Sequence, residues 1–435
     1  MPPTSPPARI SWLALAGICA LAAAVRIAWD INIHALMMSD FQYYFEKAVS
    51  VATGHGYTNG PYPTAFWPPG YSIFLAGIMS VFGQSVAVAR ASSVVLWVVS
   101  TALVYLLGLR LGGRWTAAVA ALIVALFPDL VFFANLTASE NLFVPLLLGA
   151  LLALSPRMEM SSAPSWRRTA TAGLLLGLAT VVRPTAVLLP ALVVLILVAW
   201  YRSRPALIAS LALLLAFSVP TGALLARNAL EMGAPVLSTS GGFSVWVGNN
   251  ASATGGYRIK GGYPNVPMNS PKAEVDANAM FTKLAVTWVT GHPAEFIGLV
   301  PAKFSHLFDA PTSLGWNTID TVKSPKGYTQ YRKFTRTERR ILSWVTRLKM
   351  DTALWMQTLC VIGVIGTVIA LARRRAVGVW LAALLAYWLL FHVTLANGQP
   401  RFLVSVAPAI AVGAAYAIVA TVGLAARTLG ARRAS

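Results

Sequence analysis

The chain has 435 residues, of which 57% are hydrophobic and only 11% are charged. A typical soluble domain carries about 25% charged residues, so this composition excludes an ordinary soluble globular protein. The formal net charge is +20, but in membrane proteins Lys and Arg collect at the cytoplasmic ends of spans and beside anionic headgroups. We therefore expect the lipid bilayer, and no nucleic acid, as the partner of these charges.

Apolar runs recur along the chain and have the length of membrane spans. A helix of about 20 residues crosses a hydrocarbon core of ~30 Å, and lipid offers no partner for an unpaired backbone group. The runs therefore predict an all-α polytopic membrane protein whose first run is a retained anchor. The ten expected spans are residues 10–29, 86–109, 115–134, 141–155, 169–182, 185–201, 205–226, 352–371, 377–396 and 402–425.

The segment 68–83, PPGYSIFLAGIMSVFG, decides the orientation because it is short for a span. If it does not cross and Arg9 is cytoplasmic, every short Arg-rich loop is cytoplasmic too, as the positive-inside rule requires. We therefore predict that 68–83 is an interfacial helix on the outer face and that both termini lie inside. The other arginines placed inside are Arg110, Arg114, Arg157, Arg167, Arg168, Arg202, Arg204, Arg373, Arg374, Arg375, Arg427, Arg432 and Arg433.

This topology also defines the expected domain organisation. Three segments lie outside, at residues 30–85, 135–140 and 227–351. We predict an N-terminal transmembrane module with seven spans, an extracytoplasmic loop domain, and a C-terminal transmembrane module with three spans, over residues 1–226, 227–351 and 352–435. Cys19 and Cys360 lie within apolar runs, so no disulfide framework is indicated.

The first outer segment contains the stretch MMSDFQYYFEKAVSVATGHGY, residues 37–57. Apolar residues recur there with the spacing of one helix face, which predicts an amphipathic helix lying on the membrane. Gly54 and Gly56 are expected to end this helix. The residues of the apolar face are Phe41, Tyr44, Phe45, Ala48, Val49 and Ala52.

Asp40 stands at the start of that helix. Ser39 and Gln42 match a capping box, so one interpretation makes Asp40 an acid that stabilises the helix N-terminus. The other makes it a functional carboxylate, and the two are compatible because a helix start holds a carboxylate in a fixed direction. Glu140, in NLTASENLF, faces the same compartment and leaves the same two interpretations open.

The remaining outer segments carry weaker signals. The stretch 241–257, GGFSVWVGNNASATGGY, combines flexible backbone, amides and rings that suit a carbohydrate, although an ordinary turn-rich loop is the alternative. The stretches 292–308 and 338–350 are amphipathic and are expected at the interface. The candidate sugar- or acceptor-binding residues are Tyr43, Tyr57, Trp67, Trp246, Asn249 and Asn250.

Three arginines face outward on this topology, against the positive-inside bias. They are Arg183 in TVVRPTA, Arg227 in LLARNAL and Arg401 in NGQPRFLVSVAPA. A guanidinium can fork onto a phosphate where lipid headgroups meet protein, so we predict that these residues bind a lipid-linked phosphate. Snorkelling of each side chain to the interface is the alternative.

The order of these motifs resembles the GT-C membrane glycosyltransferases, in particular the superfamily of protein O-mannosyltransferases and lipid A aminoarabinose transferases. The resemblance covers residues 10–425. It implies a GT-C-like fold with extracytoplasmic juxtamembrane helices, a polyprenyl-phosphate-linked sugar as donor, inversion at the anomeric carbon, and catalysis at the extracytoplasmic face. The matching stretches are SDFQYYFEKAVSVATGHGY, TAFWPPGYSIFLAGIMSVFG, VARASSVVLWVVSTALVYLLGLRLGG, NLTASENLF, LATVVRPTAVLLP, ARNALEMGAPVLSTSGGFSVWVGNNASATGGY and GQPRFLVSVAPA.

In that superfamily an acidic residue of the first outer loop lies at the catalytic centre, and Asp40 matches that position. Many relatives carry an adjacent second acid, whereas Asp40 stands between Ser39 and Phe41. This departure weakens the case for a bound divalent ion, which usually needs several ligands. The metal site is left unknown and a divalent ion remains an option, with further ligands drawn from His55, Glu140 and His292.

We therefore predict an inverting glycosyltransferase that moves a hexose or pentose from a polyprenyl-phosphate donor to an acceptor hydroxyl. Asp40 would act as general base with Glu140 as a second catalytic acid, and Arg401, with Arg183 or Arg227, would stabilise the leaving phosphate. The acceptor would be an envelope glycan, lipid or protein, and composition favours a multi-pass protein of the bacterial inner membrane. A lipid or glycolipid transporter is the alternative, although the long outer loop and the lack of an evident repeat count against it.

Overall fold

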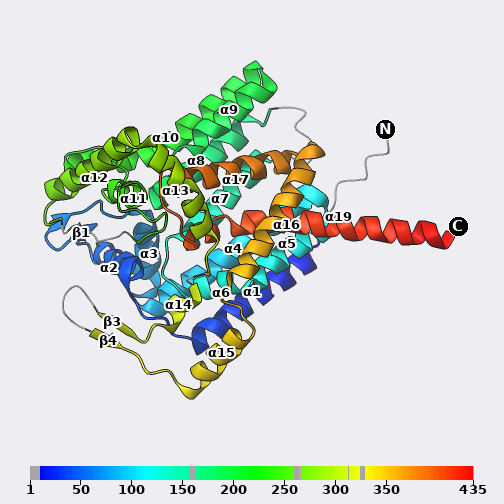
Figure 1. Ribbon diagram of the computed structural model, residues 1–435, viewed down its shortest axis with the longest axis horizontal. Helices are drawn as coiled ribbons and strands as arrows, with labels where there is room; N and C mark the ends of the chain where they lie inside the picture. Colours follow the sequence, from blue (N-terminus) through cyan, green and yellow to red (C-terminus); the bar gives the residue numbers. More distant parts are fainter. Residues whose placement is uncertain are drawn as a thin grey trace.

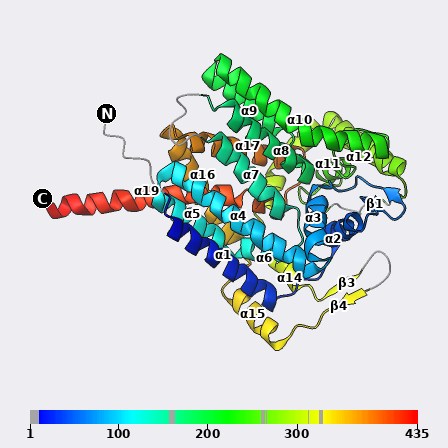
Figure 2. The ribbon, with the colours of Figure 1, turned by 180° about the vertical axis from the view of Figure 1, so that it is seen from behind.

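The computed structural model describes residues 10–155, 163–258, 264, 266–311, 313–323 and 329–434. Long helices form one bundle, and the start of α1 (Trp12–Asn32) and the end of α19 (Ala407–Ala434) lie at one end of it (Figure 1). Five helices gather at the opposite end, which we call the loop end (Figures 1 and 2). They are α2 (Ser39–Ala52), α3 (Gly70–Phe82), α11 (Gly241–Gly248), α12 (Pro271–Gly291) and α15 (Arg336–Arg347). The predicted cytoplasmic residues Arg9 and Arg157 lie outside the described residues.

Seven helices in this described part are long and apolar enough to cross a membrane. They are α1 (Trp12–Asn32), α4 (Val86–Gly112), η1 with α9 (Pro184–Ala186 and Leu189–Tyr201), α10 (Arg204–Met232), α16 (Ala353–Ala372), α17 (Ala376–Thr394) and the first part of α19 (Ala407–Ala434). The chain is therefore a multi-pass membrane protein, as its composition predicted.

The other three expected spans are also helical but are shorter than a full span. They are α5 (Arg114–Leu126), α7 (Glu140–Leu154) and α8 (Trp166–Val182), with 13, 15 and 17 residues. The prediction of one continuous span over 115–134 is wrong, because the chain is extended at Phe127 and a separate α6 (Pro128–Phe133) follows. Pro128 has no N–H to continue the ladder of α5.

The segment 30–85 folds into α2 (Ser39–Ala52), a two-stranded antiparallel hairpin of β1 (Thr58–Asn59) and β2 (Tyr62–Pro63), and α3 (Gly70–Phe82). Gly54 has a φ of 82° just past the end of α2, as predicted. The predicted capping box is wrong, because Met38 is the N-cap and no side chain caps the helix.

The apolar face of α2 is covered by protein. Phe41, Tyr44 and Ala48 are buried at 2%, 3% and 0% exposure. Tyr44 meets Tyr71 of α3 edge to face at 5.4 Å, and the Ser72 hydroxyl donates to the Tyr44 carbonyl at 3.1 Å. The prediction that this face lies on the membrane is therefore wrong, because α3 packs against it.

The segment 227–351 supplies most of the remaining structure at the loop end. Its elements are α11 (Gly241–Gly248), α12 (Pro271–Gly291), α13 (Pro293–Leu307), α14 (Ser313–Thr318), β3 (Thr321–Lys323), β4 (Thr329–Tyr331) and α15 (Arg336–Arg347). The two amphipathic stretches are helical, in α13 and α15, and their position at the membrane surface stays a prediction. A four-residue α18 (Arg401–Val404) then precedes α19.

Small residues allow the long helices to pack closely. A Cβ on Gly366 of α16 would lie 1.8 Å from the Gly413 carbonyl of α19, and one on Gly173 of α8 would lie 2.1 Å from the Leu213 carbonyl of α10. Such close approach is typical of helix pairs in membranes, where dispersion contacts replace the hydrophobic effect. These pairs bring α16 close to α19 and α8 close to α10.

Candidate active site

Four charged side chains meet at the loop end. Asp40 lies in the first turn of α2, Glu140 begins α7, Arg183 follows α8 and Arg401 begins α18. Arg401 Nη2 lies 2.6 Å from Asp40 Oδ2 and 2.9 Å from Glu140 Oε2, and Arg401 Nε lies 2.5 Å from Glu140 Oε1. Arg183 Nη1 lies 2.8 Å from Glu140 Oε1. We call this neutral group of two carboxylates and two guanidinium groups the acid–arginine cluster.

Local backbone chemistry explains why these side chains meet at helix ends. Arg183 precedes Pro184, and a residue before proline is driven to extended backbone; its φ and ψ are −145° and 113°, so α8 stops there. Asp40 and Glu140 lie in first turns, where the positive end of a helix stabilises a carboxylate. The helix-start interpretation of both acids and their place in the cluster are thus compatible.

Donors occupy the acceptor sites of the Glu140 carboxylate. Its Oε1 accepts from Arg401 Nε and Arg183 Nη1, and its Oε2 accepts from Arg401 Nη2 and lies 3.4 Å from the Ser139 hydroxyl. A carboxylate offers about four acceptor sites, and Glu140 is fully buried. Asp40 differs because only its Oδ2 contacts Arg401, and Oδ1 has no partner in the described part of the chain. Asp40 is therefore the carboxylate of this cluster that can accept a proton from another molecule.

Two aromatic rings contact the Arg401 guanidinium. Its central carbon lies 5.2 Å from the Phe41 ring centre and 5.4 Å from the Trp316 ring centre, which are cation–π distances. The two rings meet edge to face at 5.1 Å. Phe41 follows Asp40 in α2, whereas Trp316 belongs to α14, so segment 227–351 contributes directly to the cluster.

A buried amide holds Trp316 in place. The neighbouring Asn317 is fully buried, and its Oδ1 accepts from Trp29 Nε1 at 3.2 Å and from Asn135 Nδ2 at 2.7 Å. Its Nδ2 donates to the Phe132 carbonyl at 3.0 Å. Sequence reasoning missed Trp316, since no local pattern connects α14 with either acid.

Arg227, a predicted phosphate ligand, holds the β1–β2 hairpin instead. Its Nη1 donates to the Thr64 carbonyl at 2.7 Å and its Nη2 donates to the Tyr57 carbonyl at 3.1 Å. Glu274 of α12, a buried residue that the sequence analysis missed, accepts from the Thr64 hydroxyl at 2.7 Å and from the Ala65 N–H at 3.1 Å. These contacts fix the hairpin to α10 and α12 and do not bring Arg227 into the acid–arginine cluster.

Three of the predicted sugar- or acceptor-binding residues form one aromatic group beside this hairpin. Tyr43 meets both Tyr57 and Tyr44 with ring centres 6.4 Å apart, and the Tyr57 hydroxyl donates to the Trp67 carbonyl at 2.9 Å. Burial raises the pKa of Tyr43 to about 12, so its phenol stays protonated at neutral pH. The group adjoins the cluster through Tyr44, which lies one helical turn after Asp40.

The other three predicted binding residues support the fold around α11. Asn249 Oδ1 accepts from Lys303 Nζ at 2.7 Å, and its Nδ2 donates to the Leu395 carbonyl at 3.2 Å. Asn250 Nδ2 donates to the Trp246 carbonyl at 2.7 Å. Both asparagines are buried and Trp246 is half-buried. The structure thus engages these amides within the protein, and their contact with sugar stays a prediction.

The donor set does not fit a divalent metal ion. His55 Nδ1 pairs with the Thr53 hydroxyl at 2.8 Å, and His292 stacks on Trp288 with ring centres 5.8 Å apart. Arginine and serine donors occupy the oxygens of Glu140. Among the residues that the structure describes, no three His, Cys, Asp or Glu side chains form a group that could hold a metal. No catalytic step is therefore assigned to a metal.

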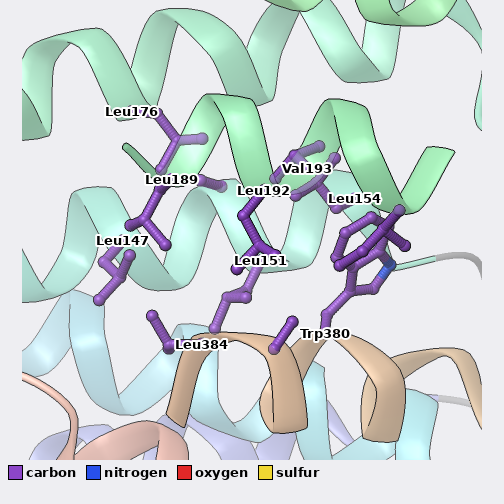
Figure 3. Close-up of a pocket in the computed structure, with 12 residues that line it drawn as sticks. Leu147, Leu151, Leu154, Leu176, Leu189, Leu192, Val193, Trp380 and Leu384 are labelled. Atoms are coloured by element: carbon purple, nitrogen blue, oxygen red, sulfur yellow. The ribbon is translucent and has the colours of Figure 1, made fainter. Parts of the chain in front are cut away.

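An apolar cavity lies along the helices that lead away from the cluster. It is a partly open hollow between α7, α8, α9 and α17, and its side chains point toward one another (Figure 3). Leu147 is seven residues beyond Glu140, which is about 10 Å along α7 at 1.5 Å per residue. The lining residues are Leu147, Ala150, Leu151, Leu154, Leu176, Leu189, Leu192, Val193, Ile196, Trp380, Ala383 and Leu384.

The bundle and the cluster define a polytopic membrane protein with a buried charged site at one end. A family model described as dolichyl-phosphate-mannose-protein mannosyltransferase matches residues 67–222. No curated protein matches the chain in a sequence comparison. The family match confirms the resemblance predicted from the motifs over residues 67–222.

Solved structures share the fold. The oligosaccharyltransferase AglB from Archaeoglobus fulgidus, in complex with an inhibitory peptide and a dolichol-phosphate, matches with a TM-score of 0.52 and 15% identity over 97% of this chain and 51% of that chain. The same enzyme in complex with Zn and sulfate matches with a TM-score of 0.51 and 14% identity, over 94% and 49% of the two chains. The chain thus spans about half the length of that enzyme, and the predicted GT-C-like fold is confirmed.

A weaker likeness extends to ArnT from Cupriavidus metallidurans, solved with bound undecaprenyl phosphate. The TM-score is 0.44 and the identity 12%, over 94% of this chain and 78% of that chain.

Proposed function

We propose that this protein is an inverting glycosyltransferase that moves a sugar from a polyprenyl-phosphate donor to an acceptor hydroxyl. The observation that carries the proposal is the pair formed by Asp40 and Arg401: one carboxylate oxygen is held at 2.6 Å, while the other has no partner in the described chain. The match to a family named for a lipid-phosphate mannose donor supports the substrate class.

Asp40 serves as the general base. Its fixed Oδ2 aims Oδ1 at the acceptor hydroxyl, whose oxygen attacks the anomeric carbon from the side opposite the phosphate. The bond between the sugar and the phosphate breaks, the proton passes to Asp40, and the electron pair leaves with the phosphate. A positioned base contributes about 10²–10⁴-fold in rate.

Arg183 is the better placed of the two cluster arginines to bind the leaving phosphate. Arg401 contacts two carboxylates, which neutralise its charge. Arg183 contacts Glu140 and the Ser139 hydroxyl through Nη1, and its buried Nε has no partner in the described chain. A phosphate oxygen that accepts from this Nε would gain a charge-assisted hydrogen bond as its negative charge grows.

Glu140 positions the two arginines rather than exchanging a proton. It is fully buried and accepts from both guanidinium groups. The sequence analysis predicted Glu140 as a second catalytic acid. In this proposal Glu140 instead positions the two arginines. The apolar cavity beyond Glu140 would receive the first isoprene units of the donor, since its lining contains no charged side chain.

We extend the proposal to the extracytoplasmic face of a bacterial inner membrane. The acceptor would be a hydroxyl of an envelope glycan, a lipid or a protein. This placement agrees with the position of α2, which carries Asp40 and lies at the end of the bundle opposite the start of α1 and the end of α19 (Figures 1 and 2). Arg183 and Arg401 join Asp40 through the acid–arginine cluster.

The test uses the purified full chain and polyprenyl-phosphate mannose. The wild type should discharge the donor to a new glycoside of inverted configuration, and Asp40→Asn should lower the rate by about 10²-fold or more with an unchanged unfolding midpoint. Glu46→Gln, at an exposed acid two turns along α2, is the matched control and should keep wild-type turnover. Counterflow of donor without any glycoside would indicate a transporter and would end the proposal.

A further inference from the structure

The helix α15 carries a cluster of exposed cations. Five basic residues of α15 and the turn after it are exposed, and none of them forms an ion pair with an acid in the described part of the chain. We call them the α15 cations; they are Arg336, Arg339, Arg340, Arg347 and Lys349.

The opposite face of α15 is firmly attached to the protein. Val345 is 2% exposed and packs in one apolar cluster with Trp29 and Ile33 at the end of α1. Glu338 completes a capping box with Thr335, so the first turn is closed as well. The α15 cations are therefore presented outward by a rigid helix rather than by a mobile loop.

The flank of α15 that adjoins α16 is apolar and exposed. Trp344 and Leu348 are 53% and 46% exposed, and Leu354 and Trp355 of α16 are 68% and 44% exposed. Trp355 Nε1 donates to the Lys349 carbonyl at 3.0 Å, which ties this flank to the cations. Exposed tryptophans at the end of a span are typical of the boundary between hydrocarbon and headgroups.

The position of α15 along the bundle also places it at the boundary between hydrocarbon and headgroups. It packs against the end of α1 and directly precedes α16, and both helices are candidate membrane spans. Figure 1 shows α15 beside the end of α1 at the loop end. The α15 cations therefore lie where the phosphates of a lipid leaflet would lie.

We propose that α15 and the start of α16 bind the headgroups of anionic phospholipids. The exposed tryptophans enter the boundary of the leaflet and the α15 cations contact the lipid phosphates, which accept forked hydrogen bonds from arginine. Asp351, a half-buried acid next to this site, leaves the local charge strongly positive. The partner is a lipid surface because the same segment exposes apolar rings beside its charges, which a soluble anion would not cover.

Native mass spectrometry of the delipidated full chain tests this site. The wild type, titrated with phosphatidylglycerol or phosphatidylcholine, should retain phosphatidylglycerol preferentially. Removal of three cations in Arg340→Gln/Arg347→Gln/Lys349→Gln should weaken phosphatidylglycerol retention by about tenfold or more. The matched control removes three other exposed cations, in Arg258→Gln/Lys272→Gln/Lys283→Gln, and should leave retention unchanged.

A second measurement locates the lipid. Brominated phosphatidylglycerol should quench the fluorescence of the wild type more than that of Trp344→Phe, whereas brominated phosphatidylcholine should distinguish them less. Equal retention of the two lipids by the wild type, or an equal loss in the control triple variant, would mean a solvated basic face and would overturn the proposal. Neither readout depends on glycosyl transfer, so the result is separate from the function proposed above.

Discussion

Arg401 forms a bidentate ion pair with Glu140, which lies 261 residues earlier in the sequence. Arg401 Nε is 2.5 Å from Glu140 Oε1, and Nη2 is 2.9 Å from Oε2. The pair joins the start of α7 to the start of α18, and therefore connects the two predicted transmembrane modules. Because Glu140 is fully buried, the contact has consequences for stability as well as for catalysis.

We expect the Arg401–Glu140 pair to be strongly coupled. Arg401→Met alone should destabilise the protein by about 3–5 kcal/mol, because the buried Glu140 carboxylate loses one of its two guanidinium partners. The double variant Arg401→Met/Glu140→Met should recover part of that loss, because no unpaired charge remains. Thermal unfolding of the four proteins of this cycle measures the coupling. Additive effects of the two substitutions would show that the pair is not a structural unit.

Trp316 should act on the site through Arg401 and Phe41. Trp316→Ala should cost about 1–3 kcal/mol of stability, since it removes two aromatic contacts, with Phe41 and Phe133, and one cation–π contact. It should also lower kcat because Arg401 loses one of the two rings that contact it. Trp316→Phe should restore most of kcat. Trp288→Ala, at a half-buried ring of α12 that stacks on His292, serves as the control and should leave kcat unchanged.

Lys303 should make stability depend on pH. Burial lowers the pKa of Lys303 from its ordinary 10.5 to about 8 in the folded protein. Between pH 8 and 10.5 the unfolded chain therefore binds the extra proton, so stability should rise with pH across this window. Across this window the unfolding midpoint of the wild type should rise relative to that of Lys303→Met. The slope, rather than the absolute midpoint, is the readout, because the variant also leaves the Asn249 amide oxygen without its donor.

The apolar cavity should select donors by their lipid chain. Ala383 lines it, so Ala383→Phe would fill part of the space. Each buried CH₂ contributes about 0.8 kcal/mol, so displacement of one isoprene unit should raise KM for a long-chain donor by about tenfold or more. A donor of one or two isoprene units should be affected less. Ala382→Phe places the same side chain at a neighbouring position outside the lining and should leave both KM values near wild type.

The charged residues show how far local reasoning extends. Asp40, Glu140, Arg183 and Arg401 could all be selected from the sequence, because each is a rare charge at the end of an apolar run. Arg227 carries the same local signature, yet it donates to the backbone of the β1–β2 hairpin. Arg227 differs from Arg183 and Arg401 in its partners, which are backbone carbonyls rather than carboxylates. Hydropathy does not specify which groups contact an arginine.

Hydropathy and helix periodicity determined the membrane class, the helical elements and the acids at helix starts, because lipid forces long apolar runs to satisfy their backbone internally. Only the tertiary structure decided that α2 buries its apolar face against α3, that Asn249 and Asn250 hold the fold around α11, and that Trp316 contacts Arg401. These outcomes depend on which distant surfaces pack together. A local sequence pattern specifies that a face will be buried, whereas its partner is chosen by the shape and charge of the whole bundle.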